Sequence, residues 1–375
     1  MLDHSFARVM PKRLLFAGGH QPARRDLGIS SLTVEDGIVP VRAVDLIKTP
    51  FCTVVELARA DLEPQSNVLL VAPLSGHFPV LLRDLIIALL PSCRVYVTDW
   101  MNIRHVPAKY GSFGLDTNIA YVLDTIRALP AGLNVIALCQ SGAPALAATA
   151  LLAGDRDPRT PASLVLMGSP IDPLANPTGV ATLLRSRPLS WFETNLIKSV
   201  ARRYAGGGRR VYPAHLQLMS LWLYLTRRLS QGGELRTKVF FDDGVDARRF
   251  PFFDLFTSIM DLDARFFLEN TRALFLESWF REGAFRFQGA RVDPAAIDKT
   301  SLLTIEGELD DIAAPGQTSA AHALCRSLAD RFRHRIVVPG SGHFSLFHGN
   351  TCRRHVVPAI LQFLKGGGPV KPAFN

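Results

Sequence analysis

The sequence predicts an α/β protein with one mostly parallel, doubly wound sheet and a set of helices inserted before the sheet is completed. Strand-like apolar runs alternate with helical patterns between residues 67 and 170, an order typical of parallel strands joined by crossover helices. The runs are apolar throughout, which is typical of strands buried on both faces. The alternation returns near residue 299, after a helix-rich stretch.

The first part of the sheet is expected at residues 67–170. The expected strand segments are "NVLLVAPLSGH" (67–77), "RVYVTDW" (94–100), "NVIALC" (134–139) and "SLVLMGSP" (163–170). The expected helices are "VLLRDLIIALL" (80–90), "NIAYVLDTIRALP" (118–130) and "APALAATALLAG" (143–154).

Residues 171–298 have a different pattern. Long amphipathic, aromatic-rich segments at 216–230 and 252–283 predict helices, and a glycine break lies at 206–208. Strand patterns then resume in "TSLLTIEGELDDIAAPG" (300–316) and "HRIVVPGSGH" (334–343), with helices expected at 317–329 and 355–368. Because the sheet resumes, residues 1–170 and 299–375 are expected to form one core, and residues 171–298 a helical cap on it.

Composition narrows the class of protein. The chain has 375 residues, 48% of them hydrophobic, which predicts a globular enzyme-sized protein. The net charge of +9 comes from scattered basic pairs without a nucleic-acid-binding motif, so we expect no nucleic-acid partner. The five cysteines are far apart and form no C-x-x-C pair, which argues against a disulfide framework or a metal site and favours a reducing compartment.

Targeting signals are not apparent in the sequence. The apolar run at residues 14–18 is too short for a secretory signal, and no segment approaches the roughly 18 apolar residues of a membrane span. These features predict a cytoplasmic protein without a transmembrane segment.

Chemistry is expected at "VIALCQSGAP" (135–144), where a strand pattern meets a helix pattern through small residues. A sharp strand-to-helix turn of this kind presents a nucleophile in many hydrolases, and its small flanks let backbone pass close by. Cys139 comes directly off the strand, and a helix N-terminus favours the thiolate form of a cysteine. Cys139 is therefore the preferred nucleophile, while Ser141 and a buried thiol without chemistry remain alternatives.

A nucleophile of this type needs a base and an orienting carboxylate. His343 follows a strand pattern and is flanked by glycines, so it is the expected base. Asp310 is the expected acid, with Asp311 and Asp172 as alternatives. The chain order Cys139, Asp310, His343 is that of the α/β-hydrolase fold. The oxyanion formed at the ester carbonyl would be bound by the backbone N–H of Gln140 and of Ser75 or Gly76.

Two further residues are candidates for substrate binding. His77 follows the expected oxyanion loop and either contacts the substrate or packs. Ser141 could place a hydroxyl near the oxyanion. No metal or organic cofactor is expected, because the acyl transfer needs none.

The sequence resembles the intracellular polyhydroxybutyrate (polyhydroxyalkanoate) depolymerases of bacteria. The resemblance lies in "VAPLSGHFPVLLRD", "VYVTDWMNIRHVP", "VIALCQSGAPALAA", "LMGSPIDPLANPT", "IMDLDARFFLENT", "FQGARVDPAAI", "LLTIEGELDDIAAPGQT" and "VPGSGHFSLFHG". It implies a cysteine nucleophile in a C-Q motif, with the triad Cys139, Asp310 and His343. This chain reads C-Q-S-G-A-P where the family usually reads C-Q-P-S/T-V-P.

The resemblance also implies a substrate and a place of action. It predicts hydrolysis of poly(3-hydroxybutyrate) to 3-hydroxybutyrate or its oligomers at the surface of cytoplasmic storage granules. The alternatives are a polyhydroxyalkanoate synthase-like acyltransferase, a non-catalytic granule-binding protein and a general esterase. The sequence makes no prediction about oligomeric state.

Overall fold

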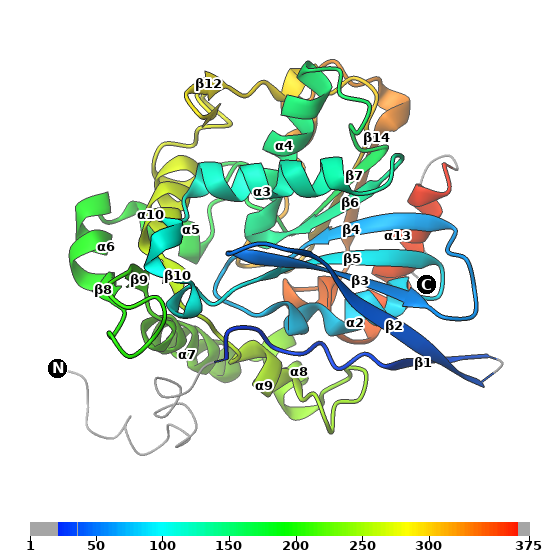
Figure 1. Cartoon of the computed structure of the whole chain (residues 1–375), viewed down its shortest axis with the longest axis horizontal. Helices are drawn as coiled ribbons and strands as arrows, with labels where there is room; N and C mark the ends of the chain where they lie inside the picture. The colour runs from blue at the N-terminus through cyan, green and yellow to red at the C-terminus, as the bar shows by residue number, and fades with distance from the viewer. Residues whose placement is uncertain (1–21, 36, 367–375) are drawn as a thin grey trace.

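The computed structural model describes residues 22–35 and 37–366, with helices on both faces of a large sheet (Figure 1). Within these residues nine strands form one sheet in the order β1-β2-β3-β5-β4-β6-β7-β13-β14. The strands are β1 (Ser31–Val34), β2 (Gly37–Lys48), β3 (Cys52–Arg59), β4 (Ser66–Val71), β5 (Cys93–Trp100), β6 (Asn134–Leu138), β7 (Ser163–Met167), β13 (Ser301–Gly307) and β14 (Arg333–Val338). Strands β1, β2, β3 and β5 pair antiparallel in turn, and β5-β4-β6-β7-β13-β14 are parallel.

The predicted mostly parallel sheet is confirmed, including the four strands expected between residues 67 and 170. Strands β6 and β7 are buried along their whole length, as expected for strands with helices on both faces. Helices α3 (Leu115–Ala128) and α4 (Gly142–Gly154) cover one face, while α2 (Arg83–Leu89) and α13 (Val357–Leu364) lie on the other (Figure 1).

Residues 171–298, which we call the cap, are mainly helical. The helices are α5 (Gly179–Arg185), α6 (Leu189–Leu196), α7 (Ala214–Gln231), α8 (Glu234–Phe240), α9 (Phe252–Phe256) and α10 (Ala264–Asn270), followed by a π-helical turn, η6 (Thr271–Leu276). Short strands complete it: β8 (Lys198–Ser199), β9 (Arg210–Tyr212), β10 (Leu262–Asp263), β11 (Arg286–Phe287) and β12 (Ala290–Arg291).

The long helix expected at 252–283 is wrong. The helix stops after α9, and the chain is non-helical, with the short strand β10, before α10 begins. Two tertiary interactions hold this non-helical segment. Met260 N–H donates to the Gly76 carbonyl at 2.6 Å, and Asp261 forms a buried, bidentate ion pair with Arg104, with both N–O distances at 2.9 Å. These bonds outweigh the local helical pattern.

The helix expected at 317–329 is also wrong, because only α11 (Ala321–Leu324) is helical there. The fully buried Glu306 side chain accepts hydrogen bonds from the N–H groups of Gly316, Thr318 and Ser319, at 2.8 to 3.0 Å. These bonds fix the turn that precedes α11, and the helix ends at Leu324. The last expected helix is present: α12 (Gly349–Thr351), the π-helical η10 (Cys352–Val356) and α13 form one continuous helical stretch that ends at Leu364, and residues 367–368 lie outside the described part.

The order of the strands determines where a site can form. From β4 the chain passes to β5 on one side and then crosses to β6 on the other. Ligands of open α/β sheets bind outside the carboxyl ends of the strands at such a switch point. The loops that follow β4, β6, β13 and β14 all leave the sheet at this edge.

No helix in the described residues is long and apolar enough to cross a membrane. The apolar run at 14–18 lies outside the described residues.

Candidate active site

Cys139 lies at the sharp turn between β6 and α4. Its φ of +51° is in the left-handed region, where a residue with a side chain costs roughly 1–3 kcal/mol and is usually held for a functional reason. Cys139 is partly exposed, whereas the other four cysteines are buried. Burial raises the pKa of both Cys93 and Cys325 to about 12, so these thiols stay protonated. The structure therefore presents Cys139 as the accessible thiol of this chain.

The small residues around Cys139 have a steric cause. A Cβ atom on Gly142 would lie 2.4 Å from Ser169 Oγ, and Ala137 is fully buried. The turn therefore has no room for larger side chains at these positions.

Ser141 is turned inward, away from solvent. Its hydroxyl accepts the Leu138 N–H at 2.8 Å and lies 2.7 Å from the carbonyl oxygens of both Leu138 and Val71. It is 3% exposed. These contacts of the Ser141 hydroxyl connect the turn to Val71, the last residue of β4.

His343 and Asp310 are brought together from the loops after β14 and β13. His343 Nδ1 lies 2.7 Å from Asp310 Oδ2, and both side chains are buried. Asp310 Oδ1 accepts the N–H groups of Ile312 and Ala313, each at 2.8 Å, which fixes the carboxylate. The Cys139 side chain lies close enough to the His343 ring to raise the pKa of that histidine. Because Nδ1 faces Asp310, Nε2 is the nitrogen that remains for the thiol.

Charge around His343 favours its protonated form. Burial is the largest influence and opposes the charge, but the negative charges at Asp310 and Cys139 together outweigh it. They raise the pKa of His343 well above its ordinary value. The arrangement can therefore support an imidazolium beside a thiolate and can move a proton between sulfur and nitrogen.

The two alternative acids have other partners among the described residues. Asp311 accepts the Tyr224 hydroxyl at 2.8 Å and pairs with Arg228, both on α7. Asp172 pairs with Arg281 at 3.2 Å. Of the three candidate acids, Asp310 is the one whose carboxylate is hydrogen-bonded to the His343 ring.

The loop after β4 is held against the cap. Gly76 has φ +96°, and a Cβ there would lie 2.0 Å from Gln217 Oε1. Phe78 N–H donates to the Ser258 carbonyl at 3.2 Å, next to the bond between Gly76 and Met260. Gln140 stands in the first turn of the helix after Cys139, where backbone N–H groups have no intrahelical acceptor. Its N–H is therefore suited to bind an oxyanion.

His77 belongs to this loop, and its side chain reaches the cap. Its Nε2 is 3.0 Å from the Phe256 carbonyl, so Nε2 carries the proton and donates. Burial lowers the pKa of His77 to about 4, and the charge of His343 adds to this effect. His77 is therefore neutral at pH 7, with Nδ1 unprotonated.

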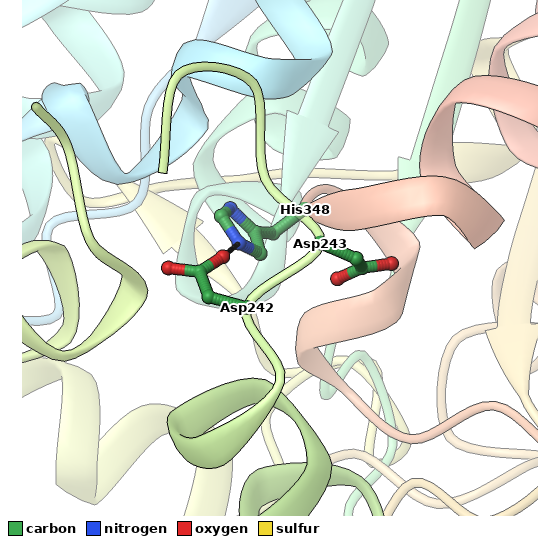
Figure 2. A group of neighbouring side chains, drawn as sticks. All are labelled: Asp242, Asp243 and His348. Carbon is green, nitrogen blue, oxygen red and sulfur yellow. Dashed lines mark hydrogen bonds and ion pairs between the residues drawn. The ribbon is translucent and has the colours of Figure 1, made fainter. Parts of the chain in front are cut away.

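A second polar group lies nearby: Asp242, Asp243 and His348 come close enough together to hold a cation (Figure 2). His348 Nε2 is 3.2 Å from Asp242 Oδ1. The buried Lys238 ammonium is 3.4 Å from Asp243 Oδ1, so a protein cation already neutralises this group. The sequence patterns did not single out these residues or Glu234, because their partners are mainly backbone groups about 110 residues away.

Comparisons with known proteins agree with this architecture. Residues 168–367 match the family model described as PHB de-polymerase C-terminus. No curated protein matches the chain. A bromoperoxidase from Bacillus anthracis is 13% identical with a TM-score of 0.50, covering 87% of this chain and 99% of its own.

Two further solved structures are similar. An epoxide hydrolase from Vigna radiata is 14% identical with a TM-score of 0.50, covering 88% of this chain and 98% of its own. An alpha/beta hydrolase fold protein from Nakamurella multipartita is 14% identical with a TM-score of 0.46, covering 90% and 99%. At such identities the likeness shows the fold alone, which is that of the α/β hydrolases.

Proposed function

Since the chain belongs to the family of PHB de-polymerases, we propose that it hydrolyses the ester bonds of poly(3-hydroxybutyrate), inside the cell and at the surface of storage granules. The family and the fold support ester hydrolysis in general. The polymer, the granule surface and the roles of individual residues are our proposal. The products are 3-hydroxybutyrate or its short oligomers.

One observation carries the catalytic part of this proposal: His343 stands between Asp310, 2.7 Å from its Nδ1, and Cys139, which acts on the same ring and raises its pKa. The matched segment 168–367 includes Asp310 and His343, while Cys139 lies before it. The assignment of Cys139 therefore rests on its left-handed turn at the end of β6 and on its proximity to His343.

The first step forms an acyl-enzyme. His343 Nε2 takes the thiol proton, and Cys139 Sγ attacks the ester carbonyl carbon. The oxyanion is bound by the N–H of Gln140 and by that of Ser75 or Gly76. When the tetrahedral intermediate collapses, the ester C–O bond breaks, His343 protonates the departing alkoxide, and a 3-hydroxyacyl thioester remains on Cys139.

The second step releases the acid. His343 accepts a proton from water as the water oxygen attacks the thioester carbonyl. The C–S bond then breaks, and the proton returns to the Cys139 sulfur. Asp310 stabilises the imidazolium in both steps without becoming protonated. His77 and Ser141, the other candidate contacts, are not needed for proton transfer.

The direct test is incubation of the full chain with native amorphous poly(3-hydroxybutyrate) granules, following release of 3-hydroxybutyrate and oligomers. Wild type should release them, and Cys139→Ala should not. Hydrolysis of soluble p-nitrophenyl esters without release from granules would indicate a general esterase. Polymer formation from 3-hydroxybutyryl-coenzyme A would indicate an acyltransferase, and granule binding without release a non-catalytic protein. Each of these results would contradict the proposal.

A further inference from the structure

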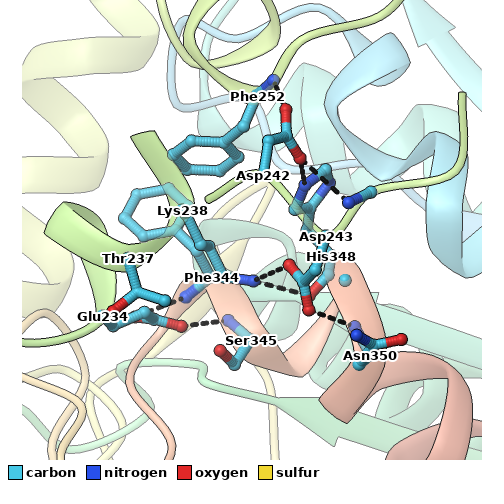
Figure 3. A network of polar contacts seen from close by, with 12 residues as sticks. Glu234, Thr237, Lys238, Asp242, Asp243, Phe252, Phe344, Ser345, His348 and Asn350 are labelled. Carbon is cyan, nitrogen blue, oxygen red and sulfur yellow. Dashed lines mark hydrogen bonds and ion pairs between the residues drawn. The ribbon is translucent and has the colours of Figure 1, made fainter. Parts of the chain in front are cut away.

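We propose that Glu234, on cap helix α8, is a positioning residue for the base His343, so that the cap holds the backbone of the catalytic histidine while Asp310 binds its ring. This inference rests on the proposed function, because it assigns His343 the role of the base. Figure 3 shows α8 and residues 242–243 lying along the loop that carries Phe344, Ser345, His348 and Asn350. We call residues 343–350 the histidine loop.

Glu234 binds the backbone directly after His343. Its Oε2 accepts the Phe344 N–H at 3.3 Å, and its Oε1 accepts the Ser345 N–H. These two donors open the short 3₁₀ turn η9 (Phe344–Leu346), whose N-cap is His343 itself. The first N–H groups of such a turn have no partner within it. The Glu234 carboxylate supplies that partner and so fixes the backbone on which the His343 ring stands.

The histidine loop is shaped to admit cap carboxylates. A Cβ on Gly342 would lie 2.1 Å from Glu234 Oε2, and a Cβ on Gly349 would lie 2.2 Å from Asp243 Oδ1. Gly349 also has φ +83°, a conformation that residues with side chains rarely adopt. Two glycines thus stand where two acidic side chains of the cap approach the loop, one just before His343 and one near the end of the loop.

The far end of the loop is anchored by the same cap segment. Lys238 Nζ donates to the His348 carbonyl at 2.9 Å, and Asp243 Oδ2 accepts the Asn350 N–H at 2.6 Å. Lys238 is 4% exposed and is paired with Asp243. Buried charges are costly unless they are paired and hydrogen-bonded, so this arrangement stabilises the fold only when the cap segment is docked.

The consequence is that two separate parts of the chain set the position of the base. Asp310 orients the ring from the core, and Glu234 orients its backbone from the cap. Glu234 does not contact the thiol or the ester, so its loss should lower the rate of the chemical step and leave binding of a small ester almost unchanged.

The test compares Glu234→Ala and Glu234→Gln with wild type in the full chain. Glu234→Ala should lower kcat for p-nitrophenyl butyrate by roughly 10- to 100-fold, the loss expected from a misplaced catalytic group, with KM within about twofold. Glu234→Gln keeps one acceptor oxygen and should recover part of the rate. The matched control is Glu269→Ala. Glu269 is another carboxylate of the cap that accepts a backbone N–H of the core, that of Leu115, at 2.7 Å. Its loss should leave kcat near the wild-type value.

A second readout does not depend on any ester. Alkylation of Cys139 by iodoacetamide at pH 7, followed by peptide mass spectrometry, reports how well His343 supports the thiolate. Glu234→Ala should slow alkylation about tenfold relative to wild type, so that its rate approaches that of the His343→Ala variant. If wild type hydrolyses no ester but shows this pattern, the proposed function fails and the positioning role stands.

Three results would overturn the positioning role. The first is a folded Glu234→Ala protein, judged by circular dichroism and thermal melting, with wild-type kcat and alkylation rate. The second is an equal loss in Glu269→Ala. The third is equal alkylation of wild type and His343→Ala, which would also remove the assignment of His343 as the base.

Discussion

At the scale of single residues, the imidazole of His343 is the group whose charge state decides the chemistry. Burial alone would keep it neutral, and the charges at Asp310 and Cys139 reverse that preference. Because the pKa of His343 in the folded protein lies above its unfolded value near 6.5, its pairing stabilises the fold fully below about pH 6.5. That stabilisation is lost as pH rises through the folded pKa.

The change Asp310→Asn tests this balance. Removing a carboxylate that lies 2.7 Å from Nδ1 should lower the pKa of His343 by about 1–3, the usual effect of a neighbouring opposite charge. NMR titration of selectively labelled histidine measures it directly, with Asp311→Asn as the neighbouring control. An unchanged pKa of His343 in Asp310→Asn would show that Asp310 does not set its charge.

Ser141 supplies the second test at this scale. Ser141→Ala leaves the Leu138 N–H and nearby carbonyl groups without the hydroxyl, so the free energy of unfolding should fall by about 1–3 kcal/mol. Esterase activity should remain, whereas Cys139→Ala should abolish it. Denaturant unfolding and p-nitrophenyl ester hydrolysis separate the two effects. Loss of all activity in a folded Ser141→Ala protein, with activity kept in Cys139→Ala, would reverse the nucleophile assignment.

The candidate triad could be predicted from the sequence because its members are chemically unusual and stand at strand ends in a known order. Glu234 could not be predicted in the same way. Its partners are the N–H groups of Phe344 and Ser345, and a backbone donor has no side-chain signature in the sequence.

At the scale of elements, the loop after β4 is where the core and the cap meet most closely. Gly76 combines a positive φ with a Cβ position only 2.0 Å from Gln217 Oε1. Gln217 cannot move away cheaply, since its amide donates to the carbonyls of Tyr212 and Met260 at 2.9 and 3.0 Å.

Gly76→Ala should therefore destabilise the protein and also lower kcat. We expect a loss of about 1–3 kcal/mol from backbone strain, with added cost from the displaced Gln217 and a distorted oxyanion loop. The control is Gly132→Ala, whose φ is +72° but whose Cβ would have no described heavy atom within 4 Å. Stability should fall in both variants, and kcat only in Gly76→Ala. An equal kcat in the two would argue against this loop as an oxyanion site.

Helix predictions failed where tertiary contacts outweigh local pattern. Residues 252–283 carry a helical, aromatic-rich pattern, yet the Arg104–Asp261 ion pair and the bond from Met260 to Gly76 hold a non-helical segment within it. Residues 317–329 form only the short helix α11, and the N–H groups at the start of this segment bind the Glu306 side chain from β13. These contacts are not local, so they could not be read from the segments themselves.

At the scale of the whole molecule, the cap contacts three of the loops that carry the candidate site. It binds the loop of Gly76 through Met260, the acid loop through Tyr224 and the histidine loop through Glu234. The parallel half of the sheet was predictable because its strands are continuously apolar. The antiparallel β2 was not predicted, and it is largely exposed along its length, including its apolar residues Ile38, Val44 and Leu46.

The central claim is that Cys139 carries the acyl group. Acid quenching during turnover of a soluble 3-hydroxybutyrate oligomer, followed by digestion and mass spectrometry, should find a 3-hydroxyacyl thioester on the Cys139 peptide of wild type and none in Cys139→Ala. An acyl group on Ser141, or an acyl adduct that persists in Cys139→Ala, would contradict the account.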